Sequence, residues 1–397
     1  MRLLGSVELS FPETAKRLFP LVLLAAYGVF LCSYFVFPDY SDPYRFFAKF
    51  VFLPGLFVMF ASLREIRREP LFLATLAYLA YLLLSGLWSD PLDWYRLGQK
   101  CTIAAYLLAF IAVTHFLIRW NSNLYRRVLQ LSVLIAAVAA LVSLLYFYRD
   151  NPFPGTRLMG IGSLTNVNEF SNVYGVFALL AMGFALRTPA LSHKLPFLLA
   201  VEVFLCFAWF GQSRTAFASL VLALIALVFL MLRQRKLLYA LVLVALAGSL
   251  AIIFPDLAKL AVLRGEGLRP QIWSGIWDAA VTAPVFGHGL IVDISLDADG
   301  LHFETAHNAF LQAFWHGGVI GLCLMVLLLV IALRTAWSRG RELGEYTVFC
   351  LLLFAACTMM TGVDTLIDRP RDQWLLFWFP LALLLGYPGT ERRLRLA

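Results

Sequence analysis

Residues 264–321 read RGEGLRPQIWSGIWDAAVTAPVFGHGLIVDISLDADGLHFETAHNAFLQAFWHGGVIG. This stretch is the one long polar interruption in a chain that otherwise consists of apolar runs joined by shorter turns. It also contains four of the six histidines of the chain. We therefore expect the functional site in this stretch, while the apolar runs around it define the fold.

The composition is that of a membrane protein. Of the 397 residues, 61% are hydrophobic and 14% are charged, and the mean hydropathy is +0.80, a balance that a soluble domain cannot shield from water. An all-α polytopic membrane protein is therefore expected. Apolar runs close to the roughly 20 residues that cross a bilayer predict about twelve spans, at residues 19–37, 45–62, 71–87, 99–118, 127–148, 170–187, 195–211, 215–232, 237–254, 309–333, 345–363 and 374–389.

The distribution of basic residues predicts the orientation. If the N-terminus is cytoplasmic, the inner segments collect 20 of the 32 lysines and arginines, and cytoplasmic segments are the basic ones in membrane proteins. Both termini are then cytoplasmic, and the net charge of +8 reports topology and gives no support to a nucleic-acid partner. We expect a single membrane domain over residues 1–397, with a long outer loop, residues 255–308, inserted between the ninth and tenth spans.

The outer loop is expected to contain an amphipathic helix. Pro270 is a favoured first helical residue, and a helix from there places Trp273, Ile276, Trp277 and Ala280 on one face. This helix should lie on the membrane surface or against the helical bundle.

Three helix N-termini are predicted on the outer side, and each carries an arginine or a histidine. Arg214 opens the eighth span after the tight turn at residues 211–215, Arg269 opens the amphipathic helix, and His307 lies in the first turn of the tenth span. If these helix ends converge, they form a site for a phosphate or pyrophosphate. The positive end of its helix would also keep His307 neutral and able to accept a proton.

Other polar residues near the outer side have two interpretations each. Asn168 or Ser171 is expected to cap the sixth span, and the nearby Arg157 is either a solvated arginine or a ligand for an anion. Glu202 lies within the seventh span, where a charge is costly. It is either a buried ion-pair partner or a brace for a neighbouring arginine.

Metal sites receive little support from the spacing. No cysteine lies in the long loop. The interval between His302 and His307 does not suit a zinc pair on a helix. The sequence predicts no metal and no cofactor.

Four pieces of the chain together resemble the O-antigen ligase and polymerase superfamily. They are RLMGIGSLTNVNEF (157–170), SRTAF (213–217), RPQIWSGIWDAAVTAPVFGHGL (269–290) and HNAFLQAFWHGGVIGL (307–322). Each piece is a weak pattern alone. Their order and their common outer location make the set fairly specific.

The resemblance implies a GT-C-like fold and an inverting, metal-independent glycosyl transfer. The donor would be a glycan on undecaprenyl pyrophosphate, and the acceptor would be lipid A-core at the periplasmic face of the bacterial inner membrane, among membrane lipids. His307 would be the general base. Arg214 and Arg269 would hold the pyrophosphate, with help from Arg157. Possible supporting residues are Asn308, Glu202, Asn168, His302, which competes for the role of base, and Arg264, which competes with Arg269.

Ligation to lipid A-core is the preferred activity within this superfamily. Polymerisation of the glycan and transfer to a protein hydroxyl are the alternatives. From a different functional class, an anion transporter would also use outer arginines, but such proteins usually show paired broken helices in related halves, which are not detected in this sequence.

Overall fold

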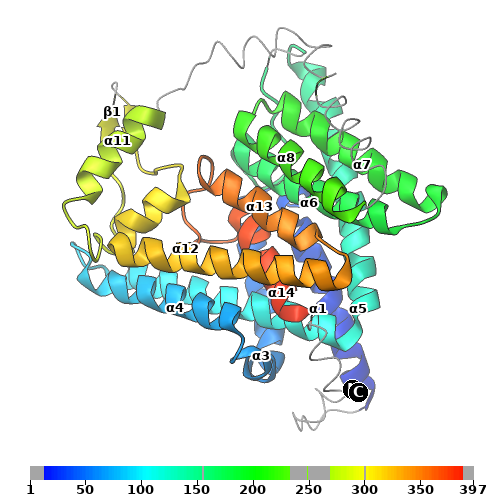
Figure 1. The fold of residues 1–397 in the computed structure, drawn as a ribbon, viewed down its shortest axis with the longest axis horizontal. Helices are drawn as coiled ribbons and strands as arrows, with labels where there is room; N and C mark the ends of the chain where they lie inside the picture. The colour runs from blue at the N-terminus through cyan, green and yellow to red at the C-terminus, as the bar shows by residue number, and fades with distance from the viewer. Residues whose placement is uncertain (1–12, 154–155, 233–247, 249–268, 299–300, 388–397) are drawn as a thin grey trace.

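The computed structural model describes the chain apart from residues 1–12, 154–155, 233–247, 249–268, 299–300 and 388–397 (Figure 1). The predicted ninth span and Arg264 therefore lie outside the described residues. The helices up to residue 231 are α1 (Glu13–Val36), α2 (Asp42–Phe46), the π-helical η1 (Phe47–Phe52), α3 (Leu53–Ile66), α4 (Pro70–Ser85), the 3₁₀-helical η2 (Gly86–Trp88), α5 (Trp94–Asp150), α6 (Val167–Arg187), α7 (Leu191–Phe210) and α8 (Arg214–Met231). After residue 268 follow α11 (Arg269–Ala280), β1 (Leu296–Ala298), β2 (Leu301–Phe303), α12 (Ala309–Leu343), α13 (Thr347–Met359), the π-helical η3 (Trp374–Trp378) and α14 (Phe379–Gly386).

The described part of the chain is a polytopic bundle of helices, as the composition predicts. It contains eight helices that are long and apolar enough to cross a membrane. The predicted second span corresponds to a continuous helical stretch from Asp42 to Ile66, and the predicted eleventh and twelfth spans correspond to shorter apolar helices, Thr347–Met359 and Trp374–Gly386.

Two predicted spans are joined in one long helix. The fourth and fifth spans both lie in α5, whose 57 residues would measure about 85 Å if straight, far more than one bilayer. Asn121 leaves helical geometry, with φ −156° and ψ 90°, and its side chain accepts a hydrogen bond from the Leu124 amide. The expected loop between these spans is thus reduced to a capped kink.

One helix, α6, lies at the centre of the bundle, since 94% of the residues in its most apolar 18-residue segment are buried. Small residues permit this close packing: Gly175 lies against the Phe354 ring of α13, and Gly183 lies against Thr347. The rigid position of α6 matters for function because its first turn carries polar side chains toward the outer loops.

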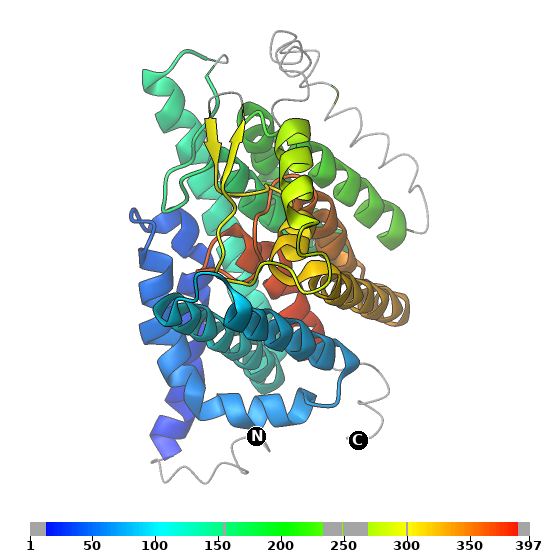
Figure 2. The ribbon, with the colours of Figure 1, turned by 90° about the vertical axis from the view of Figure 1, so that its left-hand side faces the viewer.

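The amphipathic helix is confirmed as α11, but the buried face differs from the expected one. Ile272, Ile276 and Ala280 are buried against α12 and the hairpin, whereas Trp277 is 52% exposed and stacks on Phe314. The helix therefore packs against the bundle. Beside it lies a short antiparallel hairpin of β1 and β2, which the sequence did not predict (Figure 2).

The outer loop docks on α12 at a kink. Gly318 has φ 60° and ψ −159° inside α12, which frees backbone groups around it. The Val319 amide donates to the Pro284 carbonyl at 2.8 Å, and the His288 amide donates to the Trp315 carbonyl at 2.8 Å. These bonds join the segment after α11 to the outer end of α12, which runs beside α4 (Figure 1).

We expect Gly318→Ala to destabilise the protein by at least about 2 kcal/mol, because an L-residue is strained at this backbone conformation. The added Cβ would also lie 2.3 Å from the carbonyl carbon and oxygen of Val285. Thermal unfolding in detergent measures the effect. Gly98→Ala in α5 is the control, because its Cβ would meet nothing within 4 Å. Equal melting temperatures for the two variants would contradict this prediction.

Candidate functional site

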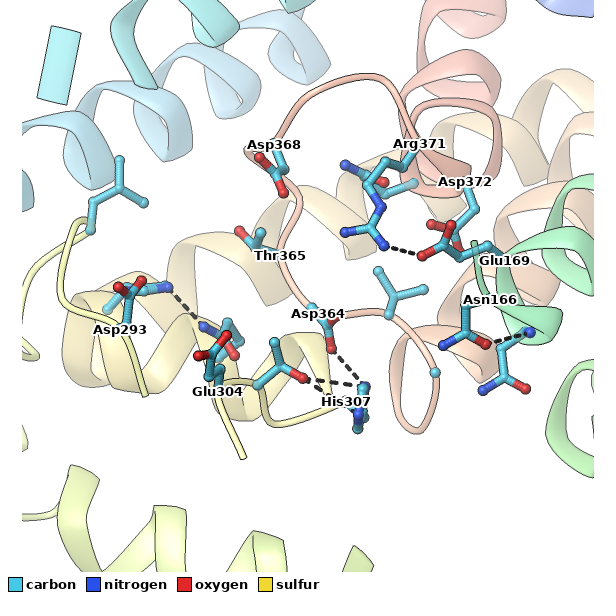
Figure 3. A pocket seen from close by; sticks show the side chains of 18 of the residues that line it. Asn166, Glu169, Asp293, Glu304, His307, Asp364, Thr365, Asp368, Arg371 and Asp372 are labelled. Atoms are coloured by element: carbon cyan, nitrogen blue, oxygen red, sulfur yellow. Dashed lines mark hydrogen bonds and ion pairs between the residues drawn. The ribbon is translucent and has the colours of Figure 1, made fainter. Parts of the chain in front are cut away.

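A polar cavity of about 350 Å³ opens at the outer ends of several helices. Its lining comes from α5, the start of α6, the segments around β2 and the start of α12, and the loop between α13 and η3 (Figure 3). His307, the predicted base, is one of the lining residues. Segments far apart in the sequence thus meet at one place.

The backbone on both sides of His307 is fixed. The carbonyl of Ala306 accepts a hydrogen bond from the Trp273 indole at 2.9 Å, and its amide donates to the Gln312 side chain at 3.3 Å. Asn308 caps α12 by accepting from the amides of Phe310 and Leu311. His307 has φ 47° and directly precedes Asn308, the N-cap of α12. The sequence placed His307 in the first turn of this helix, so that prediction was wrong by this small step.

The partner of His307 is a carboxylate that sequence reasoning missed. His307 Nδ1 lies 3.0 Å from Asp364 Oδ1, in the loop between α13 and η3. The hydrogen bond with Asp364 raises the pKa of His307, against the opposing effects of burial and of the Arg269 charge. Burial opposes ionisation of Asp364, but His307 outweighs it and lowers the pKa of this carboxyl.

This result corrects the predicted electrostatics of His307. The sequence predicted a pKa lowered by a helix N-terminus, whereas the pKa is raised by a carboxylate. Since Nδ1 is the ring nitrogen that lies beside Asp364, Nε2 is the nitrogen that can accept a proton from a substrate.

Buried tryptophans hold the loop that carries Asp364. The Trp374 indole donates to the Asp368 carbonyl at 2.9 Å, and the Trp378 indole donates to the Leu366 carbonyl at 2.8 Å. Both rings are fully buried. The sequence signal for this loop is the run TGVDTLIDRPRD at residues 361–372, which concentrates charge between two apolar runs.

Two of the predicted arginines lie close to each other and to His307. Burial lowers the pKa of Arg269, and repulsion from Arg214 lowers it further. Arg269 in turn acts electrostatically on His307. Arg214 thus influences Arg269, and Arg269 influences His307, although neither arginine lines the cavity itself.

Arg157 joins the same region through the turn between α7 and α8. Its Nε donates to the Gly211 carbonyl at 3.2 Å, three residues before Arg214. The same turn is tied to α6, because the Ser213 hydroxyl donates to Asn168 Oδ1 at 2.8 Å.

The predicted cap of α6 was assigned to the wrong residue. Asn166 caps this helix, by accepting from the Asn168 amide, and neither Asn168 nor Ser171 does so. Asn168 is free to bind Ser213 instead and lines the cavity.

Two predicted supporting residues lie outside the cavity lining. Glu202 is on an exposed face of α7, near Cys206. His302 lies on β2, where its Nδ1 is 2.9 Å from Asp297 Oδ1, and its side chain is half exposed. The position of His302 in the hairpin favours His307 as the base.

His316, in α12, belongs to a structural chain of hydrogen bonds. His316 Nδ1 lies 3.0 Å from the Gly289 carbonyl, an acceptor only, so this nitrogen is the donor. His316 Nε2 then accepts from Gln312 Nε2 at 2.9 Å, while Gln312 Oε1 accepts from the Ala306 amide. Gln312 therefore connects α12 to the residue before His307.

We expect Gln312→Leu to lower the free energy of unfolding by about 1–3 kcal/mol, because it leaves buried polar groups of His316 and Ala306 without partners. Gln271→Leu, on the exposed face of α11, is the matched control. Thermal unfolding of both variants in detergent checks the prediction. A Gln312→Leu protein as stable as the control would show that this chain of bonds contributes nothing.

Comparison with known proteins identifies the family of this chain. The family model for O-antigen ligase matches residues 198–326, which include Arg214, Arg269 and His307. An O-antigen ligase of Pseudomonas aeruginosa is 30% identical over 381 residues, which cover 94% of this chain and 92% of that protein. Since the identity extends over nearly the whole of both chains, the protein belongs to the O-antigen ligase family.

Proposed function

We propose that this protein transfers a glycan from undecaprenyl pyrophosphate to lipid A-core, with His307 as the general base. The observation that carries the proposal is the His307–Asp364 pair, 3.0 Å apart, beside two arginines that act on each other electrostatically. A base next to a cationic anion site suits a reaction in which a hydroxyl loses a proton and a pyrophosphate departs. Membership of the O-antigen ligase family supports the same reaction class.

The proposed reaction is a single displacement. The acceptor hydroxyl gives its proton to Nε2 of His307 while its oxygen attacks the anomeric carbon of the donor glycan. The bond from that carbon to the pyrophosphate oxygen breaks, and the electron pair leaves on the pyrophosphate. The reaction inverts the anomeric configuration and needs no metal in this proposal, because guanidinium groups neutralise the developing charge.

The charged and polar residues around His307 have the following proposed roles. Arg214 and Arg269 contact the pyrophosphate, and Arg157 assists them from the neighbouring loop. Asp364 orients the His307 ring and stabilises the imidazolium that forms. Asn308 and Asn168 hold the helix starts in place through their hydrogen bonds.

The orientation expected from the basic residues completes the proposal. We place the protein in the bacterial inner membrane with both termini cytoplasmic, about twelve spans in a GT-C-like arrangement, and the outer loop, residues 255–308, in the periplasm. The substrates are then the lipid-linked O-antigen and lipid A-core, which meet at the periplasmic face.

The pH dependence of transfer tests the role of the pair. The active base is neutral, so the rate rises with pH through the pKa of His307, which Asp364 holds above the ordinary value of 6.5. Asp364→Asn removes that effect, so the acidic limb of the profile should shift to lower pH while the maximal rate falls about tenfold or more. Asp278→Asn on the exposed face of α11 should leave the profile unchanged. An unshifted acidic limb in Asp364→Asn would contradict the assignment of His307 as base.

Purified protein in liposomes, supplied with lipid-linked glycan and lipid A-core, tests the function itself. We expect the core to gain glycan mass and the carrier to lose it. Extension of the lipid-linked glycan without modification of the core would instead indicate a polymerase, and modification of neither would overturn the proposal.

A further inference from the structure

The cavity beside His307 carries a charge pattern that is the opposite of the arginine side. Its lining contains six carboxylates and three permanently charged cations. The carboxylates are Glu169, Asp293, Glu304, Asp364, Asp368 and Asp372. The cavity is therefore acidic, although it adjoins the residues proposed to bind a pyrophosphate.

Each cation in the lining is paired with a carboxylate. Arg96 binds Asp293 at 2.6 Å, and Lys100 lies 3.8 Å from Asp368. Arg371 pairs with Glu169. A phosphate entering this cavity would thus find each lysine and arginine of the lining already paired with a carboxylate.

Two buried polar atoms of the lining have no hydrogen-bond partner among the described residues. The side chain of Glu169 is 9% exposed, and its Oε2 has no hydrogen-bond partner among the described residues. Arg371 Nε is likewise buried without a partner within the described part of the chain. A hydroxyl group both donates and accepts, so a ring with several hydroxyls matches a carboxylate and a guanidinium that lie together.

The remaining polar groups reinforce this chemistry. Amides of Asn166, Asn168 and Gln373 and the hydroxyl of Thr365 also line the cavity. Within the described residues, no three His, Cys, Asp or Glu side chains are grouped to hold a metal ion. The volume of about 350 Å³ is in the range of pockets that bind small molecules.

His307 lies at the junction of the two environments. Asp364, at the centre of the group in Figure 3, binds it within the cavity, while Arg269, which is not part of the lining, also acts on it electrostatically. We infer that this cavity is the acceptor subsite and binds an uncharged, hydroxyl-rich sugar ring, whereas the phosphates of the donor stay on the arginine side. This inference rests on the proposed function and assigns the two substrates to opposite sides of the base.

Two variants in the lining test the subsite. Thr365→Phe reduces its volume, and Asp368→Asn keeps the shape while it removes the carboxylate that pairs with Lys100. Matched controls are Asp278→Asn, on the exposed face of α11, and Thr282→Phe, in the exposed turn after this helix; neither residue lines the cavity. If Thr365→Phe fails to fold, Asp368→Asn still provides the measurement.

The readout is the Michaelis constant for each substrate in the liposome assay, with lipid A-core and lipid-linked glycan varied in turn. We expect both lining variants to raise the KM for lipid A-core about tenfold, with the donor KM within about twofold of wild type and the pH profile unshifted. A raised donor KM with an unchanged acceptor KM would overturn the inference, as would unchanged constants for both substrates in a folded variant.

The same assay separates this inference from the proposed function. If the wild-type protein transfers no glycan from the lipid pyrophosphate, the function itself is wrong. If the wild type transfers glycan while both lining variants keep the wild-type acceptor KM, only the subsite is wrong.

Discussion

His307→Ala is expected to reduce glycan transfer by about a thousandfold, because a general base contributes roughly 10²–10⁴ to the rate. The fold should survive, since Ala306 and Asn308, and not the imidazole ring, make the hydrogen bonds that fix the start of α12. Initial rates in liposomes and thermal unfolding of the same preparation measure the two effects separately.

His302→Ala is the matched control for this result. His302 lies five residues earlier on β2 and binds Asp297 at the surface, so its loss should change the rate less than about twofold. Wild-type transfer by His307→Ala, or a large loss in His302→Ala alone, would show that the base was assigned to the wrong histidine.

Arg269→Ala is expected to lower transfer by about a hundredfold or more, the effect of removing one group that stabilises charge in a transition state. Because Arg269 is partly buried beside Arg214, its positive charge is costly without an anion, so the loss should appear in catalysis and not in stability. Arg269→Lys should recover only part of the rate, because lysine lacks the planar fork that binds phosphate oxygens.

Arg149→Ala is a suitable control for the arginine variants. This exposed arginine at the end of α5 pairs with the adjacent Asp150, and its removal should leave the rate within about twofold of wild type. A rate for Arg269→Ala equal to that of this control would exclude Arg269 from the donor site.

Much of the membrane architecture follows from the sequence alone. The apolar runs located the helices to within a few residues in most cases, because a bilayer demands long apolar segments with all backbone bonds satisfied. The break between the predicted fourth and fifth spans falls where the sequence placed it, at Asn121, but it is a kink and not a loop. A polar turn between apolar runs looks the same in the sequence in either case.

The site was predictable only in part, for a physical reason. Arg214, Arg269 and His307 stand at helix starts that Pro, Ser and Asn residues mark in the sequence, and these residues do lie near one another. Asp364 belongs to a loop 57 positions further along the chain, and its contact with His307 arises from the packing of α13 and η3 against the bundle. Local patterns carry no information about such a pairing.

The direction in which the pKa of His307 shifts shows the same limit of local sequence patterns. A helix N-terminus is visible in the sequence and predicts a lowered pKa, but a carboxylate 3.0 Å away has the larger effect. The acidic cavity was also missed, because its six carboxylates come from four separate segments.

The most direct test of the central claim is made in cells. A strain deleted for this protein is complemented with the wild-type protein or with His307→Ala, and its lipopolysaccharide gel is compared with blots of the lipid-linked glycan. We predict uncapped lipid A-core and accumulated glycan on its carrier in the deletion strain, with capping restored by the wild type alone. Capped lipid A-core in the deletion strain, or full capping by His307→Ala, would contradict the proposed ligase.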